Sequence, residues 1–327
     1  MSGPSDLLRL CPIYRETPLF EVVIDGLSVL VKDESQRMGL GSFKALGGIY
    51  AVARLLEAAT GITLSAPQDL DRLRAAAGAQ AFVCASAGNH GLAVATGARL
   101  FGARATVVLA DPVPEGFAHR LRDRGATVLR RGATYEDSVA AAIDLAEETG
   151  AIHLADSSWP GYTEPPRLVM EGYSVLAAEM QARFETSGDW PDVVYLQAGV
   201  GGLAGAVARD IRANWAVQPR IIVVEPEAAA CLKQSAAEGA IVTAGGPVSS
   251  MGRLDCKTPS MLAFDILRSA ADRFVTVTDA QAEAAAGCLG DAGHATTPSG
   301  AAGLAALLAD RTLGKRPLII LSEGAVA

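Results

Sequence analysis

Lys44 is the residue whose position in the chain points most directly to covalent chemistry. A turn at residues 41–43, which contains Gly and Ser, precedes it, and an apolar pattern of helical period follows it through residue 57. The first turn of a helix disfavours a cation, so we expect the pKa of the Lys44 amine to be lowered there. A neutral lysine amine can form a Schiff base with a carbonyl group. An ordinary exposed lysine is the alternative that the residue alone leaves open.

A second candidate site is a turn of small and polar residues that follows one strand pattern and opens a helical one. Backbone N–H groups at the beginning of a helix have no partner within it, so they can bind a carboxylate or a phosphate. The Asn89 side chain can add a hydrogen bond, whereas His90 by itself is a weak catalytic candidate. A serine-capped turn without a ligand is the alternative. The candidate residues are Ser86, Ala87, Gly88, Asn89 and His90.

A third candidate is a glycine-rich loop between a strand pattern and a helical pattern, made of Gly199, Val200, Gly201, Gly202 and Leu203. Glycines let the backbone surround an anion such as a phosphate at the beginning of a helix. The loop also fits G-x-G-x-x-A with Ala204, and Glu225 ends the next strand pattern about 20 residues on, where a dinucleotide-binding fold has its ribose-binding acid. An NAD-dependent oxidoreductase is therefore an alternative.

Ser322 is the last candidate and follows an apolar strand pattern near the end of the chain. Ligands of open α/β sheets bind beyond the carboxyl ends of the strands, where a hydroxyl group at this position would reach them. A turn serine without a ligand is the alternative.

These candidates lie on an alternation of apolar runs and Ala-rich helical patterns, which predicts an α/β fold with parallel sheets. Helices are expected at 44–57 and 165–185, a surface excursion at 60–80 and a loop at 244–252. The predicted strands are 27–31, 81–85, 105–109, 126–129, 152–154, 193–196, 221–224, 274–277 and 318–321.

Composition excludes several classes of protein. Of the 327 residues, 50% are hydrophobic and 20% are charged, which is incompatible with an intrinsically disordered chain. The 28 Lys and Arg residues against 36 Asp and Glu residues give a net charge of −8, so nucleic acid is a poor candidate partner. Neither a membrane span nor a secretory signal is evident, and we expect a cytoplasmic protein. The five cysteines are scattered without a C-x-x-C pair, which predicts reduced thiols and no metal site.

Taken together and in this order, the four candidates resemble the fold type II pyridoxal-phosphate enzymes, the tryptophan synthase β-subunit superfamily. The resemblance implies pyridoxal 5'-phosphate as cofactor, with Lys44 as the Schiff-base lysine. It implies that residues 86–90 receive the substrate carboxylate while Asn89 contacts the ring hydroxyl of the cofactor. It further implies that residues 199–203 bind the phosphate and that Ser322 faces the pyridine nitrogen.

Within that superfamily the chain looks most like the diaminopropionate ammonia-lyases. The resemblance rests on the blocks 42–52, 156–162, 170–173, 251–259 and 322–324. Those lyases have an Asp immediately before Gly-Asn-His, whereas this chain has Ala87, as in the loop of the dehydratases. Asp156 is a candidate for the missing catalytic carboxylate, with a role in bracing the loop as the alternative. Residues 297–300 also differ from the Glu-Pro turn of many dehydratases.

The implied activity is β-elimination from a small amino acid, giving a 2-oxo acid and ammonia. Serine or threonine dehydratase and amino-acid racemase are the alternatives within the fold, and a non-catalytic amino-acid sensor is another. The resemblance implies two domains, each with a mostly parallel sheet flanked by helices. The large domain is expected at 1–78 plus 159–327 and the small one at 79–158, in a chain that forms a homodimer.

Overall fold

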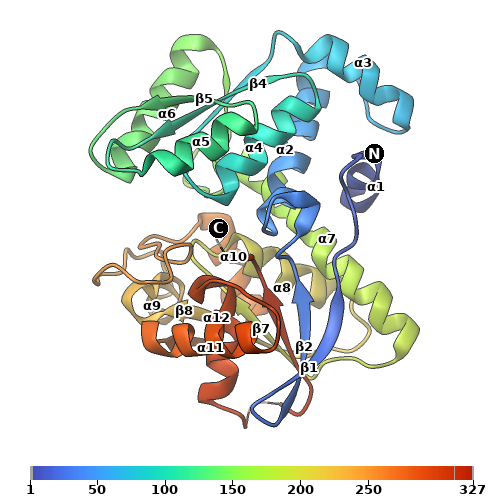
Figure 1. The fold of residues 1–327 in the computed structure, drawn as a ribbon, viewed down its shortest axis with the longest axis vertical. Coiled ribbons are helices and arrows are strands. Elements are labelled where there is room, and N and C mark those ends of the chain that lie inside the picture. The colour runs from blue at the N-terminus through green and yellow to red at the C-terminus, as the bar shows by residue number, and fades with distance from the viewer. Residues whose placement is uncertain (1–2, 313, 326–327) are drawn as a thin grey trace.

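Two separate sheets organise the computed structural model, which describes residues 3–312 and 314–325 (Figure 1). The larger sheet has six strands in the order β1-β2-β10-β7-β8-β9, and every neighbouring pair is parallel except β1 and β2. All residues of β7 and β10 are buried, as expected for strands with helices on both faces. The strands are β1 (Leu19–Ile24), β2 (Leu27–Asp33), β7 (Val193–Gln197), β8 (Arg220–Pro226), β9 (Arg273–Val277) and β10 (Pro317–Leu321).

The smaller sheet is inserted in the chain between β2 and β7. Its strands follow the order β5-β4-β3-β6 and are all parallel. They are β3 (Ala81–Cys84), β4 (Arg104–Leu109), β5 (Thr127–Arg130) and β6 (Ile152–His153). The connecting helices are α4 (Asn89–Leu100), α5 (Glu115–Asp123) and α6 (Tyr135–Thr149), and we call these seven elements the four-stranded lobe. They lie within 79–158, although the bounds of the small domain stay a prediction.

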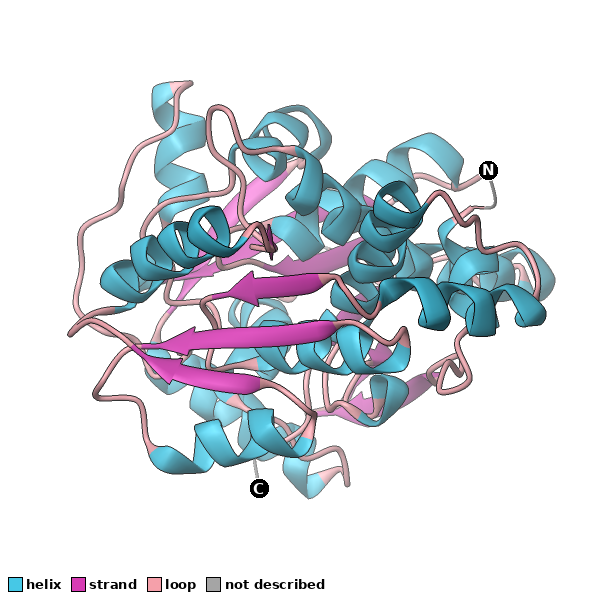
Figure 2. Ribbon diagram, turned by 90° about the horizontal axis from the view of Figure 1, so that it is seen from above, coloured by secondary structure: helices cyan, strands magenta, loops and turns pink. Residues whose placement is uncertain are grey.

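Helices cover both faces of the six-stranded sheet. Figure 2 shows the molecule from above, with helices surrounding the strands. Alternate residues of its central strands point to opposite sides, so Val194 and Leu196 join one core while Val193 and Tyr195 join another. The first core also contains α2 (Lys44–Thr60), α7 (Glu164–Ser187), α8 (Gly202–Asn214) and α10 (Met261–Ala270). The second contains α11 (Asp279–Asp291) and α12 (Pro298–Ala309). The remaining helices are α1 (Pro4–Leu10), α3 (Pro67–Ala77), α9 (Cys231–Glu238) and two short 3₁₀ segments, η1 (Arg37–Gly39) and η2 (Glu227–Ala229).

The predicted fold class is confirmed, and each predicted strand is present. Strand β1 was not predicted, because its side chains are mostly half-exposed and do not form a buried apolar run. It pairs with β2 through a hairpin turn at Asp25 and Gly26, both of which have positive φ. The surface excursion expected at 60–80 contains helix α3, whose Leu70 and Leu73 are buried one turn apart.

Glycines hold α2 between α4 of the four-stranded lobe and α7, which packs on the six-stranded sheet. We call that sheet and the helices on its two faces the six-stranded lobe. A Cβ built on Gly48 would lie 2.5 Å from the Cβ of Ala93, and one on Gly47 would lie 2.4 Å from Cε1 of Tyr173. A Cβ on Gly172 would lie 2.6 Å from the carbonyl oxygen of Leu46. The three helix backbones therefore approach more closely than any larger residue allows, and this contact holds the first turns of α2 against α4 and α7.

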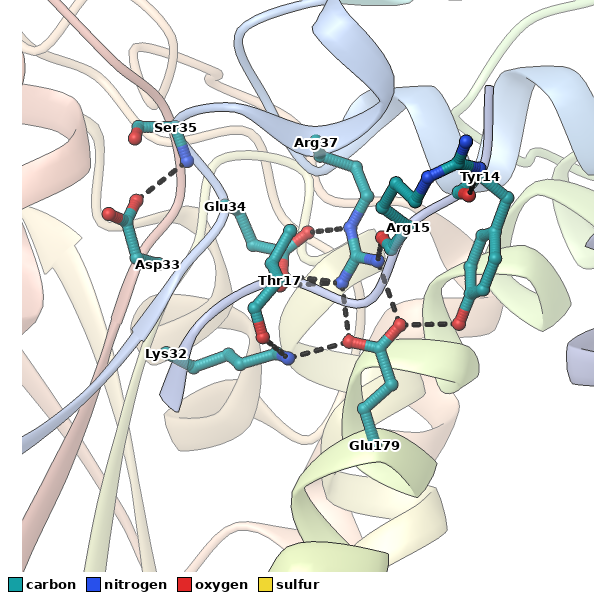
Figure 3. A network of polar contacts seen from close by, with 9 residues as sticks. All are labelled: Tyr14, Arg15, Thr17, Lys32, Asp33, Glu34, Ser35, Arg37 and Glu179. Carbon is teal, nitrogen blue, oxygen red and sulfur yellow. Dashed lines mark hydrogen bonds and ion pairs between the residues drawn. The ribbon is translucent and has the colours of Figure 1, made fainter. Parts of the chain in front are cut away.

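A buried network of charges ties α7 to the chain that leads into α2 (Figure 3). Glu179 accepts hydrogen bonds from Lys32 at 2.6 Å and from Arg37 at 2.7 Å. Arg37 also donates to Glu34 at 2.7 Å, so two cations face two carboxylates. Burial works against the carboxylate of Glu179, but Arg37 and Lys32 outweigh it and hold its pKa below the usual range. The network is charge-balanced, and each member depends on the others because little water reaches it.

We expect Glu179→Gln to lower the free energy of unfolding by about 3–5 kcal/mol, because it leaves two buried cations with one carboxylate. Urea unfolding followed by tryptophan fluorescence measures this, with the exposed Glu185→Gln in the same helix as control. The pKa of Glu179 is lowered on folding, so its contribution is present above the unfolded pKa of about 4.3 and is lost below it. The difference in the free energy of unfolding between wild type and variant should therefore become smaller in acid. A difference that does not change with pH would contradict this account.

Candidate active site

Three of the four candidate segments follow neighbouring strands of the six-stranded sheet. The segment that contains Lys44 follows β2, Ser322 follows β10, and the glycine loop follows β7. The carboxyl ends of parallel strands lie at one edge of the sheet, which brings these segments together. The backbone N–H of Phe43 donates to the carbonyl of Ser322 at 3.1 Å, and Ser42 forms a β-bridge with Glu323.

Lys44 forms an ion pair with Asp156, which lies in the loop between β6 and α7. The two side chains are 23% and 21% exposed, so a small molecule can reach them. Burial disfavours the charged amine, but the adjacent carboxylate outweighs burial and raises the pKa of Lys44. The expected lowering of this pKa is therefore wrong, because the helix terminus is weaker than a carboxylate in contact. Burial likewise opposes ionisation of Asp156, and contact with Lys44 holds its pKa well below the usual range.

The fourth candidate turn comes from the four-stranded lobe, between β3 and α4, and faces the same edge. Asn89 donates from its side-chain amide to the carboxylate of Glu323, which connects this turn to the segment after β10. Gly88 is the N-cap of α4, and its own N–H lies 3.3 Å from the hydroxyl of Ser86. The first amides of α4 are left without partners inside the helix, as an anion site at a helix terminus requires.

His90 has a different position from the rest of this turn. Its side chain is buried, and Nε2 lies 2.8 Å from the carbonyl oxygen of Leu154, to which it must donate. Burial lowers the pKa of His90, so the ring is neutral near pH 7. The side chain therefore links α4 to the end of β6 through Nε2, whereas Nδ1 is buried and has no hydrogen-bond partner.

The glycine loop forms a cradle at the beginning of α8. Gly201, the N-cap of this helix, has φ +94°, a conformation that favours glycine. A Cβ on Gly199 would lie 3.0 Å from Sγ of Cys256, and one on Gly202 would lie 3.8 Å from the carbonyl oxygen of Asp156. The loop is thus next to the ion pair, with the first amides of α8 free of intrahelical partners. An anion the size of phosphate suits these donors.

Ser322 is buried, and its hydroxyl has a defined partner. The side-chain nitrogen of Gln197 lies 3.1 Å from Ser322 Oγ, 2.8 Å from the carbonyl of Ile320 and 3.2 Å from that of Gly300. Two carbonyl acceptors fix the amide orientation of Gln197, so this nitrogen faces Ser322 as a donor. The hydroxyl oxygen can therefore accept from Gln197 while its hydrogen is donated to a ligand.

Sequence reasoning missed three further polar residues at this edge. Glu323 is buried, accepts from Thr297 at 2.5 Å and from Asn89, and lies 3.6 Å from Nε of Arg253. Glu323 stands beside Ser322 in a block that the resemblance singled out, which was the available signal. Arg253 and Thr297 also lie in segments that the resemblance singled out, 251–259 and 297–300, but only the folded chain brings them to Glu323.

The acid that an NAD site requires is engaged elsewhere. Glu225 is fully buried, and its carboxylate accepts from the backbone N–H groups of Leu232 at 2.7 Å and Lys233 at 2.8 Å. Burial raises its pKa to about 7, although these two hydrogen bonds oppose the shift. Glu225 therefore caps the beginning of α9 and is not available to a ribose.

Two absences hold for residues 3–312 and 314–325. These residues contain no cluster of three or more His, Cys, Asp or Glu side chains that could hold a metal ion. They also contain no helix long and apolar enough to cross a membrane. The five cysteines are free, and Cys11, Cys84 and Cys231 are buried.

Comparisons with known proteins agree with this arrangement. The family described as pyridoxal-phosphate dependent enzyme matches residues 10–323. A diaminopropionate ammonia-lyase of Escherichia coli K12 is 34% identical over 311 residues, which cover 90% of this chain and 77% of that protein. The crystal structure of the Escherichia coli enzyme in complex with an aminoacrylate-PLP azomethine reaction intermediate superposes with a TM-score of 0.83 at 30% identity, covering 98% of this chain and 87% of that one. An L-threonine ammonia-lyase of Geobacter sulfurreducens is 32% identical over 251 residues, 75% of this chain and 59% of that protein.

The ion pair predicts how the Lys44 amine titrates. In the protein without cofactor, Asp156→Asn should lower the pKa of Lys44 by about 1–3 pH units, because burial then acts without the opposing carboxylate. NMR titration of protein labelled with ¹³C at the lysine Cε measures the pKa, and Lys44→Arg assigns the signal. The exposed Asp189→Asn is the control and should leave that signal unchanged. An unaltered Lys44 titration in Asp156→Asn would contradict the electrostatic role of the pair.

Proposed function

The chain belongs to the pyridoxal-phosphate dependent enzyme family, and from that premise we propose that it is a lyase that eliminates the β-substituent of a small amino acid. The products are a 2-oxo acid and ammonia, and diaminopropionate is the first candidate substrate. The observation that carries the proposal is the Lys44–Asp156 pair beside the glycine loop, in a chain 34% identical to a diaminopropionate ammonia-lyase over 90% of its length.

The residues present fit the cofactor. The glycine loop offers backbone donors for a phosphate at the beginning of α8, where Gly201 is the N-cap with φ +94°. Ser322 offers a hydroxyl hydrogen to the pyridine nitrogen, since Gln197 is positioned to donate to its oxygen. A hydroxyl, unlike a carboxylate, does not require that nitrogen to be protonated. When bound, pyridoxal phosphate supplies an electron-withdrawing ring that stabilises negative charge at the substrate Cα.

The turn at the beginning of α4 is proposed to bind the substrate carboxylate. The amides of Gly88, Asn89 and His90 lie at a helix terminus, where the helix dipole favours an anion. The side chain of Asn89 donates to Glu323 and is proposed to contact the ring hydroxyl of the cofactor once that group is bound. Substrate is thereby oriented by the four-stranded lobe and the cofactor by the six-stranded lobe.

Lys44 is proposed to remove the Cα proton of the substrate. Its amine takes up the proton at Nζ, and the carboxylate of Asp156 stabilises the ammonium group that results, as it does in the ion pair. The pair also fixes the position of Nζ at the N-terminus of α2. We therefore propose Asp156 as a catalytic residue that stabilises the protonated amine of Lys44. It acts without the second acid of the ammonia-lyases, because this chain has Ala87 at that position.

A dehydratase acting on serine or threonine is the second candidate. The Ser-Ala-Gly-Asn-His turn favours it, as does the similarity to an L-threonine ammonia-lyase. The reaction type is the same β-elimination, and only the leaving group differs, a β-hydroxyl instead of a β-amino group.

The homodimer, the cytoplasmic location and the domain bounds at 79–158 also remain proposals, supported by the family resemblance.

The proposal predicts that the purified protein, with its cofactor, absorbs light near the edge of the visible spectrum. It also predicts that the protein releases ammonia and a 2-oxo acid from at least one of diaminopropionate, serine and threonine. Lys44→Ala should lower kcat by about 10²–10⁴-fold, because it removes the group that takes the Cα proton. Lys233→Ala is the control, since Lys233 is exposed. Full turnover by Lys44→Ala would overturn the assignment, as would a colourless protein that binds NADH.

A further inference from the structure

Two arginines approach the same aromatic ring at the edge where the proposed carboxylate turn lies. The guanidinium carbon of Arg120, in α5, is 4.9 Å from the centre of the Phe117 ring. That of Arg253, in the chain between α9 and α10, is 5.9 Å from the same centre. The four-stranded lobe thus supplies one cation and the rest of the chain the other. The two positive charges lie at the same ring even though they repel each other.

Neither guanidinium group is satisfied by the protein. Nη2 of Arg120 and Nε of Arg253 are shielded from solvent and have no hydrogen-bond partner. Within residues 3–312 and 314–325, Arg120 forms no ion pair, and the one acid near Arg253 is Glu323 at 3.6 Å. Burial and the neighbouring charge of Arg253 lower the pKa of Arg120, with Glu323 opposing. Such donors are costly to bury unless a ligand binds them.

Glu323 cannot balance both cations, because it carries one negative charge and the two guanidinium groups carry two positive charges. Two guanidinium groups therefore face one carboxylate, and this end of the site carries a net positive charge. The buried network around Glu179 differs, since its two cations meet two carboxylates. The uncompensated charge distinguishes the arginine pair from a structural cluster.

The pair also adjoins the place where the proposed substrate is held. A Cβ built on Gly88 would lie 3.7 Å from Nη1 of Arg253, so the guanidinium group covers the carboxylate turn. The backbone amides of that turn already suit the α-carboxylate. A further negative group on the substrate side chain would find the two arginines beside it.

We propose that Arg120 and Arg253 form a subsite for a second carboxylate, carried by the side chain of the amino acid substrate. The planar guanidinium group binds carboxylates through two parallel hydrogen bonds, which suits both arginines to this ligand. The inference rests on the proposed β-elimination and narrows its substrate to acidic amino acids. The same charges disfavour the cationic side chain of diaminopropionate, so within the proposed β-elimination an acidic amino acid replaces diaminopropionate as the first candidate substrate.

Serine and 3-hydroxyaspartate form a matched pair of probes, because they share the β-hydroxyl and differ by one β-carboxylate. In each, the Cα–H and Cβ–O bonds break, the proton passes to Lys44 Nζ and the hydroxyl leaves as water. Hydrolysis of the carbon–nitrogen bond then consumes one water, which balances the water lost before, and releases ammonia. The products are pyruvate from serine and oxaloacetate from 3-hydroxyaspartate, without an oxidant or reductant.

For the cofactor-loaded enzyme we expect kcat/KM for 3-hydroxyaspartate to exceed that for serine by about 10- to 100-fold. Arg120→Met and Arg253→Met should each remove most of this preference, because they lower kcat/KM for 3-hydroxyaspartate more than kcat/KM for serine, and Arg253→Lys should retain part of it. Arg122→Met is the matched control, since Arg122 lies in the same helix and pairs with Glu115. A preference for serine in the wild type, or an equal loss for both substrates in the variants, would overturn the subsite.

A binding measurement separates failure of this inference from failure of the proposed function. Succinate should raise the melting temperature of the wild-type holoenzyme more than butyrate does, and this difference should disappear in Arg120→Met and Arg253→Met. If the wild type converts no amino acid yet binds succinate through the arginines, the proposed function fails and the subsite stands. If succinate and butyrate act alike on the wild type, the subsite is wrong, whatever the enzyme converts. Circular dichroism confirms that the variants are folded.

Discussion

The placement of α2 is the constraint on which the rest of the site depends. Its backbone packs against α4 and α7 through Gly47, Gly48 and Gly172, at distances that leave no room for a Cβ. Interiors packed this closely transmit small displacements. Because Lys44 is the first residue of α2, the same contacts that join the two lobes also set the position of its amine.

Buried charges serve three different purposes in this molecule. Around Glu179 the charges balance and hold the chain before α2 against α7 (Figure 3). Lys44 and Asp156 also balance each other, but they remain partly exposed, so their pairing can be exchanged when a ligand arrives. Arg120 and Arg253 are not balanced by the protein. The degree of charge compensation, rather than burial, separates these groups, because the Arg253 side chain is 32% exposed and that of Lys44 is 23% exposed.

The net charge of −8 gave no hint of the three places where we propose that anions bind. Two of them are helix beginnings, at α4 and α8, where backbone amides supply the donors without any charged side chain. The third is the arginine pair, whose members lie more than a hundred residues apart in the chain. Local electrostatics therefore diverge from overall composition, since net charge counts side chains and ignores both dipoles and placement.

The sequence alone determined every strand except β1, the helices at 44–57 and 165–185, and the identity of the segments that meet at the site. Buried parallel strands are continuous apolar runs, and glycine turns before helices mark anion sites, so both are visible locally. Strand β1 and helix α3 were missed, because their exposed residues obscure those patterns. Only the tertiary structure decided the sign of the pKa change at Lys44, the capping role of Glu225 and the meeting of Arg120 with Arg253. Each depends on a partner distant in the chain, and electrostatic energy is set by distance in space rather than by separation in sequence.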